Sequence, residues 1–189
     1  WNIGALGIEF KPPFYSGLGG LRRRPMNEEI SGLPTRRAAL RLLDAVMRMG
    51  TQMDQATANA TKGLSPPDRA LAIAIAQETL RWSIDLDVLI DSKTKQRLPD
   101  DAKARGVLRL ALAQILRLGT PAHAAIATAL PLVDGGPRRL VHGVLGALLR
   151  ADVALPELPS LPDAVAMRWQ PAWGDTMLAG AQAALAEPP

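Results

Sequence analysis

Four arginines near the start of the chain, Arg36, Arg37, Arg41 and Arg48, lie in one stretch with helical periodicity. On a helix, successive residues are rotated by about 100°, so positions 37, 41 and 48 fall within about 40° of each other, flanked by Arg36. Guanidinium groups on a rigid element can contact successive phosphates of a nucleic acid. A solvated polar face, on which Asp44 neutralises Arg41 or Arg48, is the alternative interpretation.

Two histidines are the only imidazole side chains, and the chain has no cysteine. A metal site made of His123 and His142 would need nearby carboxylates, and none stands at ligand spacing. We therefore predict no metal site. His123 follows Pro121 closely and is expected near the start of a helix. His142 is expected to pack or cap, with a contact to RNA as the alternative.

Other residues capable of chemistry form no convincing catalytic set. Asp85, Asp87 and Asp91 are expected to face solvent or to neutralise Arg81, and not to work as a paired acid and base. The glycine-rich stretch 17–20 follows no strand pattern and precedes no Lys-Ser or Lys-Thr, so it is not a phosphate-binding loop. The sequence thus predicts no catalytic residue.

Composition favours a folded domain of helices. Hydrophobic residues make up 48% and charged residues 21% of the 189 residues, which excludes a disordered chain. A net charge of +4 is compatible with a polyanionic partner. The absence of cysteine fits a reducing compartment, no apolar run is long enough to span a membrane, and the start does not resemble a signal peptide. We expect a cytoplasmic protein with no membrane partner.

The hydrophobic spacing predicts an all-α fold. Ser65-Pro66-Pro67-Asp68 has the residues of a helix start, and a break is expected near Ser83. The run that follows Pro99 is apolar on nearly all sides, as in a central buried helix. Trp82 is expected to be a partly buried anchor. The predicted helices are at about 35–49, 51–62, 66–82, 83–90, 107–118, 121–130 and 140–150, with a turn at 134–137.

Proline and glycine divide the chain into four segments. Residues 1–33 are expected to form a loose leader, and Met26 is a candidate true start, with the residues before it not native. Residues 34–150 form the predicted domain, 151–162 a Pro-rich linker, and 163–189 a short helical tail. Trp169 and Trp173 are expected to fasten this tail.

The predicted domain resembles the NusB-type RNA-binding domain. Each matching piece is a degenerate helical pattern, but the ordered set spans well over half the chain. The pieces are TRRAALRLLDAV (35–46), DRALAIAIAQETLRW (68–82), LDVLI (86–90), VLRLALAQILRLGTPAHAAIATAL (107–130) and RRLVHGVLGALLR (138–150).

Several features are more similar to the N-terminal region of the Sun/RsmB group of 16S rRNA cytosine-5 methyltransferases than to free-standing NusB antitermination factors. These are ETLRW before LDVLI, the LRLGTPAHAA stretch, and a Pro linker that leads to MRWQPAWGD. The resemblance implies ribosomal RNA as a partner and a catalytic domain in cis, beyond residue 189, that uses S-adenosylmethionine and a cysteine nucleophile. No cofactor is expected in this segment.

The resemblance also implies that the first helix contributes basic residues to an RNA surface, which favours RNA binding by Arg36, Arg37, Arg41 and Arg48. Two positions depart from the family pattern: His142 stands where the family usually has Asn, and Glu78 where it usually has Gly. The RNA contact of that Asn is therefore in doubt at His142. Two other hypotheses stay open: a free-standing antitermination factor, and a helical scaffold that docks proteins.

Overall fold

The structure is a computed structural model and describes residues 30–187. The predicted leader, the candidate start Met26 and the glycine-rich stretch 17–20 lie almost entirely outside these residues. The described part contains α-helices, one short 3₁₀ turn and no strand, which confirms the all-α prediction. The elements are α1 (Leu33–Met47), α2 (Met53–Ala60), α3 (Pro66–Arg81), α4 (Ser83–Ser92), α5 (Lys103–Leu116), α6 (Ala122–Ala129), η1 (Leu130–Leu132), α7 (Gly135–Arg150) and α8 (Asp163–Ala186).

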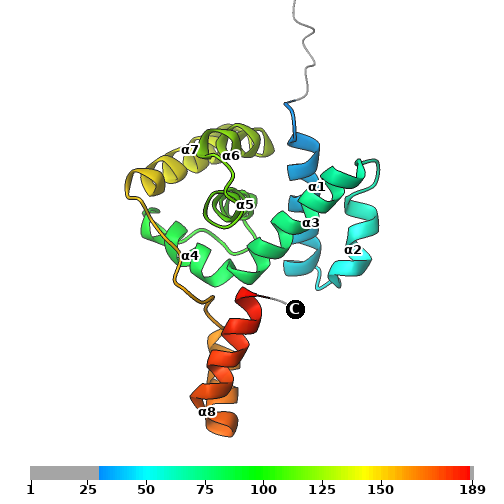
Figure 1. Ribbon diagram of the computed structural model, residues 1–189. Coiled ribbons are helices and arrows are strands. Elements are labelled where there is room, and N and C mark those ends of the chain that lie inside the picture. Colours follow the sequence, from blue (N-terminus) through cyan, green and yellow to red (C-terminus); the bar gives the residue numbers. More distant parts are fainter. Residues whose placement is uncertain (1–29, 188–189) are drawn as a thin grey trace, which may run out of the picture.

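Helix α5 occupies the centre of the bundle, as its apolar sequence predicts. It contacts α1, α3, α4, α6 and α7, and Figure 1 shows it end-on with the other helices around it. Every residue from Ala104 to Gln114 is buried. The side chains of Leu108, Leu110 and Leu112 are at most 1% exposed, so α5 is the element against which the others pack.

Most predicted helix limits are confirmed to within a few residues. The Ser65 hydroxyl caps α3 by accepting a hydrogen bond from the Asp68 backbone N–H at 3.3 Å. Trp82 lies between α3 and α4, so the break near Ser83 is confirmed. The prediction of a turn at 134–137 is wrong, because α7 already begins at Gly135 with Asp134 at its N-cap. Pro137 is compatible with a first helical turn, where its missing N–H costs nothing.

The linker after α7 is joined to α4 by hydrogen bonds to Asp85. Asp85, which is 8% exposed, accepts the Ser160 backbone N–H at 2.9 Å and the Ser160 hydroxyl at 2.6 Å. Pro159 is buried beside this contact, and its carbonyl accepts a hydrogen bond from Gln182 of α8 at 3.1 Å. The linker is therefore a positioned segment.

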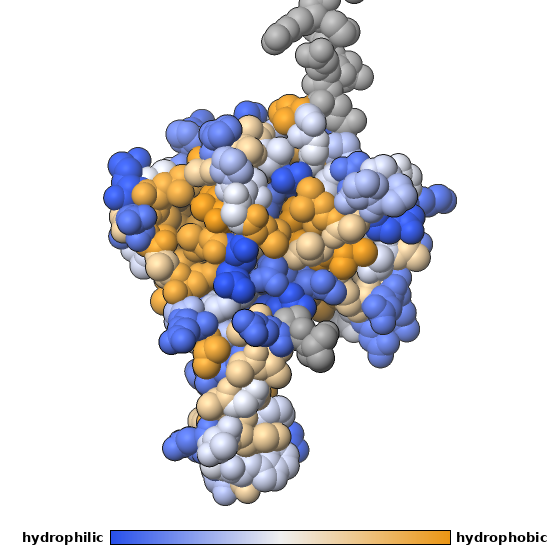
Figure 2. Space-filling model, in the orientation of Figure 1, coloured by the Kyte–Doolittle hydropathy of each residue, from blue (hydrophilic) through white to orange (hydrophobic). Residues whose placement is uncertain are grey.

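Helix α8 is a hairpin of two helical pieces. Gly174 has φ 74° and ψ −179°, a conformation that only glycine adopts readily, and Figure 1 shows the two pieces running in opposite directions. Trp169 and Trp173 meet edge to face, with ring centroids 5.7 Å apart. No residue of α8 is buried, and Figure 2 shows the hairpin projecting from the body of the bundle.

Candidate nucleic-acid interface

Helix α1 has an apolar side packed into the bundle and an arginine side open to solvent. Ala38, Ala39 and Leu42 are at most 1% exposed, whereas Arg37 and Arg41 are exposed. These two arginines are one helical turn apart, about 6 Å along the axis. We call the pair the arginine ridge.

A hollow lies on each side of the arginine ridge, and each adds a lysine. One, of about 330 Å³, is lined by both arginines and by Lys103 at the start of α5, together with Asp44 and Asp134. The other, of about 340 Å³, is lined by both arginines and Lys62, and no acidic side chain is among its described lining residues. The basic surface therefore comprises Arg37, Arg41, Lys62 and Lys103, from three separate parts of the chain.

Lys62 and Lys103 were not predicted as site residues from the sequence. Each lysine is an ordinary polar residue near a helix end, with no periodic relation to α1. Only the packing of α2 and α5 against α1 brings them to the ridge. Helical periodicity within one segment cannot reveal such neighbours.

Arg36 does not share the open side of α1. Its Nε donates a hydrogen bond to Gln114 Oε1 at 2.8 Å, and Gln114 is 1% exposed in the central helix. Burial lowers the Arg36 pKa from its ordinary value, against the opposing charge of Asp68. This geometry gives Arg36 a role in joining α1 to α5.

The start of α1 is fixed to the start of α3. The Thr35 hydroxyl donates to Asp68 Oδ1 at 3.0 Å, and the Ser65 hydroxyl donates to Asp68 Oδ2 at 2.6 Å. These two hydrogen bonds hold the pKa of Asp68 below its usual value. Since Thr35 lies two residues before Arg37, the contact sets where the arginine ridge begins.

Arg48 lies at the other end of α1 in different electrostatic surroundings. It is exposed at the C-cap, where it lines a small depression with Asp44, Asp100 and Asp101. Three carboxylates nearby make this end a weaker place for a phosphate than the ridge. RNA binding by Arg48 stays a prediction.

His142 is separated from the arginine ridge. It is exposed on α7, and Figure 1 shows α7 and α1 on different sides of α5. Its neighbour Gly143 instead lines a groove with Lys93 and Lys95. RNA binding by His142 stays a prediction, and it would belong to a second surface.

The acidic residues of α4 have structural partners, so the expectation that they face solvent or neutralise Arg81 is wrong. Arg105, with a fully buried side chain, contacts Asp87 at 2.9 Å and Asp91 at 2.6 Å. Arg109 donates two hydrogen bonds to Asp87. Arg81 instead pairs with Glu78 at 2.6 Å. Asp87 and Asp91 therefore compensate arginine charges inside the bundle, and Asp85 binds Ser160.

Trp82 is more deeply buried than expected. It is 1% exposed, and the Arg117 guanidinium lies 4.6 Å from its ring centroid. The ring face is thus covered and is not open to a base. His123 is exposed in the first turn of α6, where it was predicted.

Neither a metal-ligand group nor a membrane-spanning helix is found among the described residues. No group of three or more His, Asp or Glu among them could hold a metal ion. Nor is any described helix both long and apolar enough to cross a bilayer.

Comparisons with known proteins agree with this architecture. Over 122 residues, 64% of this chain, the sequence is 34% identical to "Ribosomal RNA small subunit methyltransferase B" of Xanthomonas campestris pv. campestris, and the aligned region covers 28% of that relative. No solved structure matches the chain. The NusB family matches residues 33–150, which contain α1 through α7. The chain therefore belongs to the NusB family.

Proposed function

We infer that this chain is the RNA-binding module of a 16S rRNA cytosine-5 methyltransferase, and that the arginine ridge docks the RNA for a catalytic domain in cis. The observation that carries the proposal is the exposed Arg37–Arg41 pair between two hollows that add Lys62 and Lys103. Such an enzyme would meet its substrate in the cytoplasm.

The chemistry of the ridge suits a sugar–phosphate backbone. Arg37 and Arg41 are held on a helix whose opposite side is fixed in the bundle core, so the backbone that carries them loses little conformational freedom when they bind. Guanidinium groups can contact phosphate oxygens in a bidentate manner. Contacts of this kind position an RNA without selecting its sequence, which is what a docking module requires.

The methyltransferase assignment is supported by the relative and by the tail. The relative is named for methylating small-subunit ribosomal RNA and is much longer than the aligned region. In the α8 hairpin, Met167 is 70%, Trp173 59% and Met177 45% exposed. Exposed large apolar side chains on a projecting element suit contact with a further domain, which would supply S-adenosylmethionine and the cysteine nucleophile.

A binding measurement with a 16S rRNA fragment tests the proposal. Fluorescence anisotropy should show affinity that falls as salt is raised. The variant Arg37→Glu/Arg41→Glu should bind at least about tenfold more weakly and with a smaller salt slope. Arg168→Glu, which changes an exposed arginine on α8, is a control with half the charge change and should bind as the unaltered chain does.

Two results would contradict the proposal. One is RNA binding that is absent or independent of salt. The other is a loss of log affinity in the Arg168 control about half as large as in the ridge variant, which would show that only total charge matters because the control changes half as much charge. Absence of RNA binding together with tight binding to a separately produced catalytic domain would favour the docking-scaffold hypothesis.

A further inference from the structure

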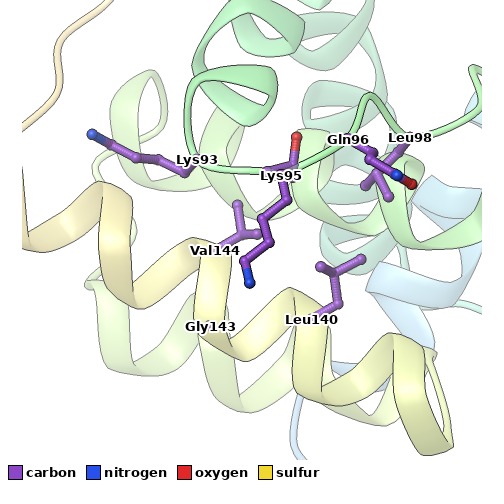
Figure 3. A pocket seen from close by; sticks show the side chains of 8 residues that line it. Lys93, Lys95, Gln96, Leu98, Leu140, Gly143 and Val144 are labelled. Carbon is purple, nitrogen blue, oxygen red and sulfur yellow. The ribbon is translucent and has the colours of Figure 1, made fainter.

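A second basic surface lies away from the arginine ridge, between the segment after α4 and helix α7. It contains a groove of about 570 Å³ with Leu98, Leu140 and Val144 as apolar lining. Lys93, Thr94, Lys95 and Gln96 line the groove from the segment after α4, and Gly143 lines it from α7. Figure 3 shows the Lys95 side chain extending toward α7 between Val144 and Leu140.

The charged residues that line the groove are all positive. None of the described residues that line it is acidic, and Lys93 and Lys95 are both exposed. Helix α7 adds exposed Arg138 and Arg139 near its start, and its sequence contains no Asp or Glu. A groove with two lysines and no carboxylate among its described lining residues is complementary to a polyanion.

The absence of a side chain at Gly143 keeps the groove open. A Cβ built at this position meets nothing within 4 Å, and the backbone there is ordinary helix. Glycine inside a helix costs about 1 kcal/mol relative to alanine. No close packing in the described part of the chain requires this glycine, so its effect is to leave the apolar lining of the groove uncovered.

We propose that this groove binds a nucleotide splayed out from single-stranded RNA, an inference that rests on the proposed RNA-binding function. The base lies against Leu98, Leu140 and Val144. The Gln96 amide, which can both donate and accept, bonds to the base edge. Lys93 and Lys95 bind the flanking phosphates. Unpaired RNA presents a flat apolar face beside a charged backbone, and this combination matches an apolar lining with a cationic rim.

The test uses the 189-residue chain and a fluorescent 12-nucleotide oligouridine that carries one 4-thiouridine. Lys93→Gln/Lys95→Gln should reduce the slope of log affinity against log salt by about 1.4, the value for two lost phosphate contacts on a single strand. Gly143→Leu should weaken binding about tenfold by filling the groove. Photocrosslinks from 4-thiouridine should map to residues 93–98 and 140–144.

A matched control separates the groove from general effects on folding. Gly180→Leu also replaces a helical glycine with open space around it, on exposed α8. It should bind the oligouridine as the unaltered chain does. Leucine favours helix over glycine, so neither variant should lower the thermal midpoint, and weakened binding by Gly143→Leu would then report on the groove.

The proposal for the groove and the proposal for the arginine ridge can be contradicted separately. If Gly143→Leu binds RNA normally while Arg37→Glu/Arg41→Glu loses binding, this inference is overturned and the proposed function stands. If Gly143→Leu binds RNA normally but no longer binds a separately produced methyltransferase domain, the groove is a protein-docking surface and the inference is again wrong. If the unaltered chain binds no RNA, both proposals fall.

Discussion

Arg109 of α5 forms two hydrogen bonds with Asp87 of α4. Its Nε donates to one carboxylate oxygen at 2.7 Å, and its Nη2 donates to the other at 2.6 Å. The arginine side chain is 4% exposed and the aspartate side chain 21%. Arg105 shares the same carboxylate at 2.9 Å and is fully buried. Asp87 therefore contacts both buried arginines of the central helix.

Removing this carboxylate should destabilise the bundle strongly. Asp87→Ala leaves Arg109 buried without its carboxylate and Arg105 with Asp91 as its one remaining carboxylate, and breaking a buried pair typically costs about 3–5 kcal/mol. Urea unfolding followed by circular dichroism measures the change. Asp101→Ala, at an exposed position, is the control and should change the unfolding free energy by less than about 0.5 kcal/mol. Equal midpoints for the two variants would contradict the prediction.

Stability should also fall in acid, and Asp87 should contribute to the fall. Burial opposes ionisation of this carboxyl, but the hydrogen bonds and charges of Arg109 and Arg105 outweigh burial and hold its pKa below the ordinary value. A carboxyl with a lowered pKa stabilises the fold above its unfolded value of about 3.9, and this stabilisation is lost as the pH falls through the folded-state pKa.

The pH dependence is measured by urea unfolding at several pH values from 7 to 3. The unfolding free energy should be nearly level down to about pH 5 and should drop below about pH 4. Asp87→Asn, which cannot ionise, should be less stable at neutral pH and should show a shallower drop. A variant whose curve runs parallel to that of the unaltered chain would exclude this role for Asp87.

Arg36 and Arg41 should separate stability from RNA binding, although they are only five positions apart. Arg36→Leu removes the donor to Gln114 and leaves a buried amide oxygen without a partner, at a cost of about 1–3 kcal/mol. Arg41→Leu changes an exposed residue and should cost less than about 0.5 kcal/mol, but it should weaken RNA binding more than Arg36→Leu does. Thermal unfolding and anisotropy are measured on both, and the reverse pattern would refute the division of roles.

Gly174 should control the α8 hairpin without affecting the bundle. Alanine at φ 74° and ψ −179° is strained by about 1–3 kcal/mol. Because no residue of α8 is buried, this cost should speed amide exchange over residues 163–186 and leave the global unfolding midpoint unchanged. Gly180→Ala, on the same element with ordinary helical backbone, should slow exchange there. A lowered global midpoint in Gly174→Ala would show that α8 supports the core.

Periodicity predicted the helices well because burial repeats every turn and leaves a local pattern. The central position of α5 follows from its apolar residues alone. Its two buried arginines were missed, since an arginine in an apolar run reveals its partner only when another helix is placed beside it. Asp87 and Asp91 are four residues apart on α4, so both carboxylates lie on one side, and this spacing was the available signal.

The candidate site was predictable only where it lies within one helix. Arg37 and Arg41 share a side of α1 because they are one turn apart, and the structure places both in solvent. Arg36 is rotated by one residue, which is enough to direct its side chain to Gln114. Lys62 and Lys103 come from other parts of the chain, and the groove between Lys95 and α7 depends on tertiary packing, so no local pattern could reveal either.

The two hydrogen bonds between Asp85 and Ser160 have a mechanical consequence. The linker is fixed at Ser160, three residues before α8 begins. Because so few residues are free to move between these points, the hairpin has a restricted orientation relative to the bundle. A folded domain joined rigidly to that hairpin would have the same restricted orientation. An RNA strand bound to the bundle would then lie at a constant distance from that domain.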